Sequence, residues 1–154
     1  MANLNAEKIF DIAEQVERDG ANFYRKAAEH ANEDCRSVLL ALATMESNHE
    51  RTFADMRADF SDGELQPLVT DPARKGALYL QAAIDGKIFG ANPLSELTGT
   101  ESIDRIFEIA IDLEKDSVIF YQSMKALVPP GRARQQLDKI IDEEIGHILE
   151  LTRT

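Results

Sequence analysis

Two short segments of the chain carry a glutamate and a histidine in the same spacing. One is Glu46-x-x-His49 and the other is Glu144-x-x-His147. Residues three positions apart in a helix lie on one face, one turn from each other. A carboxylate and an imidazole placed in this way can bind one metal ion together. The paired motif therefore raises the question of a metal site.

Both motifs lie in apolar stripes that recur at alternating spacings of three and four residues, which is typical of the inward face of a helix in a bundle. In one stripe Glu46 and His49 stand between Leu42 and Phe53. Two other segments have the same kind of stripe, and each contains one glutamate. One inward layer is thus expected to hold six residues: Glu17, Glu46, His49, Glu114, Glu144 and His147.

Four buried carboxylates need compensating charge, because each would otherwise cost several kcal/mol. No lysine or arginine stands in the stripe positions. Two divalent cations would balance the four carboxylates, and the imidazoles would add neutral nitrogen ligands. A single Glu-x-x-His is readily explained as a chance pair on a solvated helix face. The complete set instead matches the ligand pattern of ferritin-like di-iron proteins.

Glycine and proline are concentrated in the middle of the chain and around Pro129-Pro130-Gly131, and they delimit the elements. The pattern predicts an all-α, ferritin-like four-helix bundle in one domain over residues 1–154. Two helical hairpins are joined by a long crossover, 61–100, with a short helix of its own over 73–89. Thr98 or Thr100 is expected to cap the third long helix. The long helices are expected at about 5–31, 35–60, 101–128 and 132–153.

The two hairpins repeat one another. Eight of the sixteen residues in 9–24 recur in 106–121 at an offset of 97, and the Glu-x-x-His motifs correspond at an offset of 98. Agreement this dense indicates an internal repeat. The bundle is therefore expected to have an approximate two-fold axis that relates the two halves of the metal layer.

The bulk composition excludes several classes of function. A formal net charge of −11 disfavours nucleic acid and anionic membranes as partners. The single cysteine, Cys35, excludes a disulfide framework and a four-cysteine zinc or rubredoxin-type iron site. No segment has the run of about 20 apolar residues that a membrane span needs. A cytoplasmic location is the expectation.

The Glu-x-Asp-x3-Phe-Tyr string, which ends at Tyr24 and again at Tyr121, and the two Glu-x-x-His motifs resemble the rubrerythrin branch of the ferritin-like family over nearly the whole chain. The resemblance implies a non-haem di-iron centre with the six residues of the layer as ligands and with Glu46 and Glu144 bridging the ions. It also implies reduction of hydrogen peroxide or activation of dioxygen, and a homodimer. Electrons would come from a separate donor, such as a rubredoxin-type protein. Manganese or zinc could replace iron.

The chain is expected to depart from the rubrerythrin pattern in two respects. Rubrerythrins proper carry a rubredoxin domain with four cysteines, whereas this sequence has one cysteine, which is why a separate electron donor is expected. Rubrerythrins resemble this chain but have an additional carboxylate where Ser117 stands, and the repeat-equivalent position is Gly20. These two small residues either allow close helix packing or leave space beside the metals for peroxide or dioxygen.

Four further side chains near the layer have two interpretations each. Tyr24 and Tyr121 either hydrogen-bond to ligand carboxylates, which is the usual role of such groups around a metal site, or supply a proton or electron. Asp19 and Asp116 are either partners of the imidazoles or ordinary surface charges.

Two functions compete with peroxide reduction. A ferritin-type protein that oxidises and sequesters ferrous iron would use a similar ligand set. A non-catalytic helical module would leave the site empty or filled with zinc. Metal analysis and particle size separate these alternatives.

Overall fold

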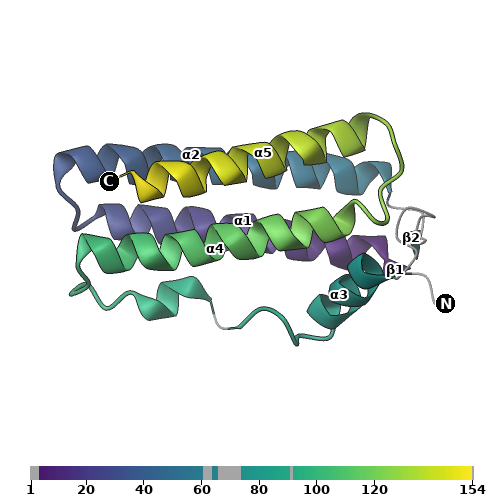
Figure 1. Cartoon of the computed structure of the whole chain (residues 1–154), viewed down its shortest axis with the longest axis horizontal. Helices are drawn as coiled ribbons and strands as arrows, with labels where there is room; N and C mark the ends of the chain where they lie inside the picture. Colours follow the sequence, from purple (N-terminus) through teal and green to yellow (C-terminus); the bar gives the residue numbers. More distant parts are fainter. Residues whose placement is uncertain (1–3, 61–63, 66–73, 91, 154) are drawn as a thin grey trace.

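The four long helices run side by side in a bundle (Figure 1). The computed structural model describes residues 4–60, 64–65, 74–90 and 92–153. The all-α, four-helix prediction is confirmed. The long helices are α1 (Ala6–Ala28), α2 (Glu33–Asp59), α4 (Ile103–Met124) and α5 (Arg132–Thr152).

The α1–α2 and α4–α5 pairs form the two hairpins (Figure 1). Side-chain oxygens of Asn5, Asn32 and Ser102 accept backbone N–H bonds at the starts of α1, α2 and α4, which satisfies donors that a helix leaves free. The prediction that Thr98 or Thr100 caps the third long helix is therefore wrong. The backbone N–H groups of Thr98 and Gly99 donate to the Glu101 carboxylate instead, and α4 begins at Ile103, after the Ser102 cap.

The crossover carries a shorter helix than the sequence predicted. This helix, α3 (Lys75–Ile84), is followed by Gly86 at φ +75°, a conformation that favours glycine and ends the helix. A 3-10 helix, η1 (Pro93–Glu96), lies further along. The predicted start at residue 73, and residues 61–63, 66–73 and 91 of the crossover, lie outside the described residues. The described crossover packs along the face formed by α1 and α4 (Figure 1).

A two-stranded antiparallel pair was not predicted. Strand β1 (Leu4–Asn5) pairs with β2 (Glu64–Leu65), so Asn5 belongs to a strand and caps α1 rather than starting the helix. Two residues on each side are too few for an alternating pattern to be visible in the sequence. Among the described residues, none of the helices has the length and apolar character that a membrane crossing requires.

Two apolar clusters fill the bundle on either side of a polar layer. One cluster is centred on Phe10, Phe53 and Leu137, and the other on Phe23 and Leu39. In every long helix the polar positions of the layer stand between residues of the two clusters. The helices therefore hold the charged layer where apolar side chains separate it from solvent at both ends.

Candidate metal centre

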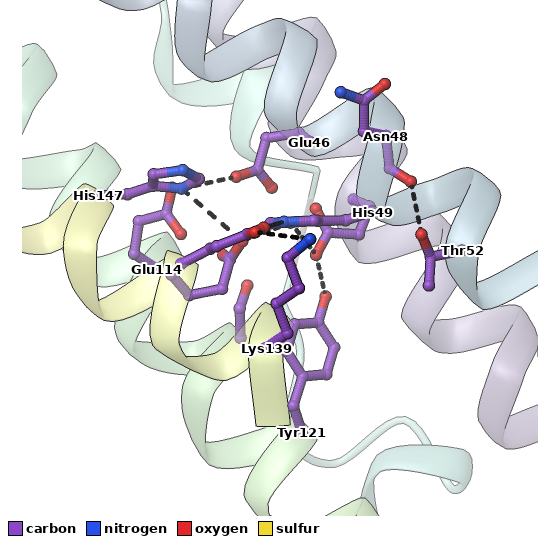
Figure 2. A network of polar contacts seen from close by, with 12 residues as sticks. Glu46, Asn48, His49, Thr52, Glu114, Tyr121, Lys139 and His147 are labelled. Carbon is purple, nitrogen blue, oxygen red and sulfur yellow. Dashed lines mark hydrogen bonds and ion pairs between the residues drawn. The ribbon is translucent and has the colours of Figure 1, made fainter. Parts of the chain in front are cut away.

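The structure brings all six residues of the predicted layer together in the middle of the bundle. Figure 2 labels Glu46, His49, Glu114 and His147 among them. Each long helix contributes: α1 and α4 one glutamate each, and α2 and α5 one Glu-x-x-His pair each. All six side chains are buried, with at most 6% of any residue exposed. The members are Glu17, Glu46, His49, Glu114, Glu144 and His147.

The six residues form two overlapping groups of four, and both groups include Glu46 and Glu144. Glu17 and His49 complete the first group, and Glu114 and His147 complete the second. Within each group one donor atom from every residue lies within 4.8 Å of the others. A metal ion with bonds of about 2.1 Å to oxygen and nitrogen holds opposite ligands about 4 Å apart, so each group has the size of one ion site. Glu46 and Glu144, which belong to both groups, are the residues for which the sequence resemblance implied a bridging role.

Both histidines present Nδ1 to the carboxylates. His49 Nδ1 lies 2.7 Å from Glu144 Oε1 and 3.5 Å from Glu17 Oε1. His147 Nδ1 lies 3.3 Å from Glu46 Oε1 and 3.4 Å from Glu114 Oε1 (Figure 2). Each imidazole therefore faces one glutamate of its own hairpin and one of the other hairpin, which connects the two hairpins at the layer.

The chemistry of this donor set fits metal ions. Atoms buried without a hydrogen-bond partner of good geometry are rare in folded proteins, yet among the described residues they concentrate here. Every side chain of the layer has at least one such atom, including both oxygens of Glu144 and the Nδ1 atoms of both histidines. Oxygen and imidazole donors that converge in this way are the usual environment of iron, manganese or zinc.

Without metal, protons must neutralise the layer. Burial, followed by the nearby carboxylates, raises the pKa of Glu17 and Glu144 well above the usual range and raises that of Glu46. Burial also opposes ionisation of Glu114, but contacts with Glu144 and His147 bring its pKa below the usual value. Burial lowers the pKa of His147, but the neighbouring carboxylates outweigh it and raise that pKa to about 10. Metal binding at this layer is therefore expected to displace protons.

Each tyrosine near the layer bonds to a glutamate of the opposite hairpin. The Tyr24 hydroxyl donates to Glu114 Oε1 and the Tyr121 hydroxyl donates to Glu17 Oε1, both at 2.6 Å. Burial and the adjacent carboxylates raise the pKa of both phenols well above 10, so they remain protonated donors. The two hydroxyls are therefore placed to orient Glu114 and Glu17, the unshared glutamates, each of which belongs to only one of the two groups.

Sequence reasoning missed one carboxylate near the layer, Glu143, which contacts the other ring nitrogen of His49. His49 Nε2 lies 2.6 Å from Glu143 Oε2, and Lys139 Nζ lies 3.8 Å from the other oxygen of Glu143. Donation from Nε2 leaves the Nδ1 lone pair of a neutral imidazole free for a metal. At the repeat offset of 98, the position equivalent to Glu143 is Met45, which carries no carboxylate.

The two aspartates considered as imidazole partners have other surroundings. Asp19 accepts bonds from Gln15 at 2.6 Å and Asn92 at 3.3 Å. Asp116 lies at the surface near Asp112. The loss of some of its hydration, followed by the Asp112 charge, raises the pKa of Asp116. The interpretation of Asp19 as a partner of a ligand imidazole is therefore not supported.

Comparison with known proteins assigns the chain to a family. The sequence model of the rubrerythrin family matches residues 8–153. This chain belongs to the rubrerythrin family. The resemblance inferred from the sequence is thereby confirmed, and the buried carboxylate and histidine cluster is the candidate di-metal site of a rubrerythrin-family protein.

A solved structure gives the same assignment for the fold. A protein from Thermotoga maritima, described as a ferritin-like diiron-carboxylate protein, is 26% identical to this chain. The similarity covers 99% of this chain and 95% of that one, with a TM-score of 0.74. No curated protein matches the chain significantly.

Substitution of Glu143 tests its role behind His49. Glu143→Ala is expected to weaken metal binding at one of the two positions by about 10- to 100-fold, because the imidazole loses the bond that orients it. Calorimetric titration of the metal-free protein with Zn²⁺ would measure both affinities. Asp142→Ala, at the exposed neighbouring position, is the control and should leave both unchanged. Equal affinities in Glu143→Ala and wild type would contradict this role.

Two glycines inside helices provide a matched pair. A Cβ at Gly20 would lie 3.0 Å from Glu46 Oε2, whereas a Cβ at Gly146 would meet nothing within 4 Å. Alanine favours a helix by about 1 kcal/mol over glycine. Gly146→Ala should therefore stabilise the metal-free protein by about that amount in urea denaturation and leave metal affinity unchanged. Gly20→Ala should gain less stability and lose metal affinity several-fold, because Glu46 must move. Wild-type affinity in Gly20→Ala would show that Glu46 has room to adjust.

Proposed function

We propose that this protein is a di-iron oxidoreductase that reduces hydrogen peroxide to water. The observation that carries the proposal is the pair of four-residue groups that share Glu46 and Glu144. This arrangement offers two adjacent ion positions with bridging carboxylates. When bound, two ferrous ions supply the two electrons that the reaction H2O2 + 2 e⁻ + 2 H⁺ → 2 H2O requires.

The side chains around the layer have distinct roles in this proposal. The four glutamates match the charge of two divalent ions, and they can change coordination as the metal charge changes. The hydroxyls of Tyr24 and Tyr121 keep the unshared glutamates, Glu114 and Glu17, in position. The apolar clusters at both ends of the layer exclude bulk water, which strengthens the electrostatic interactions within the layer.

Access from outside also supports a small oxidant as substrate. A cavity between α1 and α4 reaches Glu46 and Glu114 past the small residues Gly20 and Ser117. This supports the interpretation that the two small residues leave space beside the metals. We further propose that a separate electron-donor protein of rubredoxin type restores the ferrous state, and that the protein acts as a cytoplasmic homodimer.

Anaerobic loading with Fe²⁺, followed by one equivalent of hydrogen peroxide per metal pair, tests the reaction. The near-ultraviolet absorption of ferric iron should appear after the peroxide is mixed in, and two irons should be oxidised per peroxide. Glu46→Ala and His147→Ala should abolish the change, because each removes a predicted ligand. Glu150→Ala, an exposed glutamate on α5, is the control. An unchanged spectrum, or faster oxidation by dioxygen than by peroxide, would contradict the proposal.

A further inference from the structure

The cavity beside the candidate metal centre is larger than hydrogen peroxide requires. Its volume is about 290 Å³, whereas one water occupies roughly 30 Å³ in the liquid. The volume approaches the lower end of the range for pockets that bind small organic molecules, roughly 300 Å³. The cavity therefore has room for a ligand with more than two heavy atoms.

The inner wall of the cavity belongs to the metal layer. Glu46 and Glu114 line it together with Tyr24, and Gly20 and Ser117 keep the passage open. Glu46 and Glu114 are both members of the group that contains His147. A ligand in the cavity would therefore reach this ion position.

The outer wall comes from the crossover. Phe89, Gly90 and Pro93 line the cavity on this side. The Phe89 ring packs edge-on against Phe120 with centroids 5.6 Å apart, and Asn92 Nδ2 donates to Asp19 at 3.3 Å. These contacts hold the crossover to α4 and α1, so the cavity is a built feature of the fold.

The lining selects a neutral, largely apolar molecule. Ile12, Val16 and Leu113 supply apolar surface between the outer wall and the layer. Asp19 and Asp116 also line the cavity, and the chain has a net charge of −11. This charge disfavours carboxylates and phosphates as ligands, because anions would meet acidic groups at both the rim and the inner wall.

We propose that the cavity binds the organic group of a small neutral hydroperoxide, with its O–O group directed to Glu46 and Glu114. The inference rests on the proposed peroxide reduction and names a further substrate class for the same site. The O–O bond breaks and ROOH takes up two electrons and two protons to give ROH and water. The electrons would come from two ferrous ions held by the six residues of the layer, which would be oxidised to ferric iron, and the protons would come from solvent.

Binding is tested first without any redox reaction. Zn²⁺-loaded protein labelled with ¹⁵N is titrated with cumyl alcohol, the inert product analogue of cumene hydroperoxide. We expect saturable shifts of amide signals within 12–20 and 113–117. No saturable shift, or shifts confined to other parts of the chain, would overturn the proposal whatever the protein does with hydrogen peroxide.

Turnover is tested next by a ratio of rate constants. Fe²⁺-loaded protein is mixed with cumene hydroperoxide or hydrogen peroxide, and oxidation is followed by stopped flow. Val16→Phe, which fills the cavity, should lower the ratio of the organic to the hydrogen peroxide rate constant at least tenfold. Val38→Phe is the matched control, because Val38 is a half-buried valine of α2 outside the cavity, and it should keep the wild-type ratio.

The outcomes separate this inference from the proposed function. If hydrogen peroxide oxidises the wild-type protein but cumene hydroperoxide reacts at least 100-fold more slowly, the inference fails and the proposed function stands. If neither oxidant reacts, the proposed function fails, and so does the substrate class that rests on it. An unchanged ratio in Val16→Phe would also overturn the inference. If Val16→Phe does not load two metals, the wild-type titration with cumyl alcohol decides.

Discussion

The rest of the structure depends on the burial of four carboxylates at one level of an apolar bundle. Each would cost several kcal/mol if it were ionised and unpaired there, and the buried charged side chains among the described residues include no lysine or arginine. In the metal-free protein, protons on glutamates and on His147 offset part of this charge, as the raised pKa values of Glu17, Glu144 and His147 show. Metal ions would take the place of these protons, so metal binding, proton release and stability are coupled through the same side chains.

The ligand set is nearly symmetric, but its surroundings are not. On one side, His49 is held from behind by Glu143, and the repeat-equivalent residue of the other half is Met45. The cavity lies toward the other ion position, where Glu46 and Glu114 form its inner wall. One ion position thus has an imidazole that contacts a further carboxylate, and the other lies beside the cavity. The two halves of the internal repeat therefore differ in the surroundings of their ion positions.

The sequence was sufficient for the bundle and for the six residues of the layer, because buried positions leave a strong periodic pattern. A glutamate such as Glu17 inside an apolar stripe is conspicuous, and the repeat supplies its counterpart. Glu143 lies next to a stripe position and is half-buried, so only the contact across helices identifies it. The repeat marks the tyrosines as equivalent but does not indicate that Tyr24 bonds to Glu114 of the other hairpin. Gly20 and Ser117 indicated a space beside the metals as one of two interpretations, but the irregular crossover gave no sign that Phe89, Gly90 and Pro93 would line that space.

The most direct test of the account is the number of metal ions that the layer binds. Anaerobic equilibrium titration of the metal-free protein with Fe²⁺, checked by elemental analysis after desalting, should give two ions per chain. Glu46→Ala and Glu144→Ala, which remove the shared carboxylates, should each weaken both ions, whereas Glu17→Ala should affect mainly one. A wild-type stoichiometry of one or zero, or two ions that bind unchanged without the shared glutamates, would contradict the account.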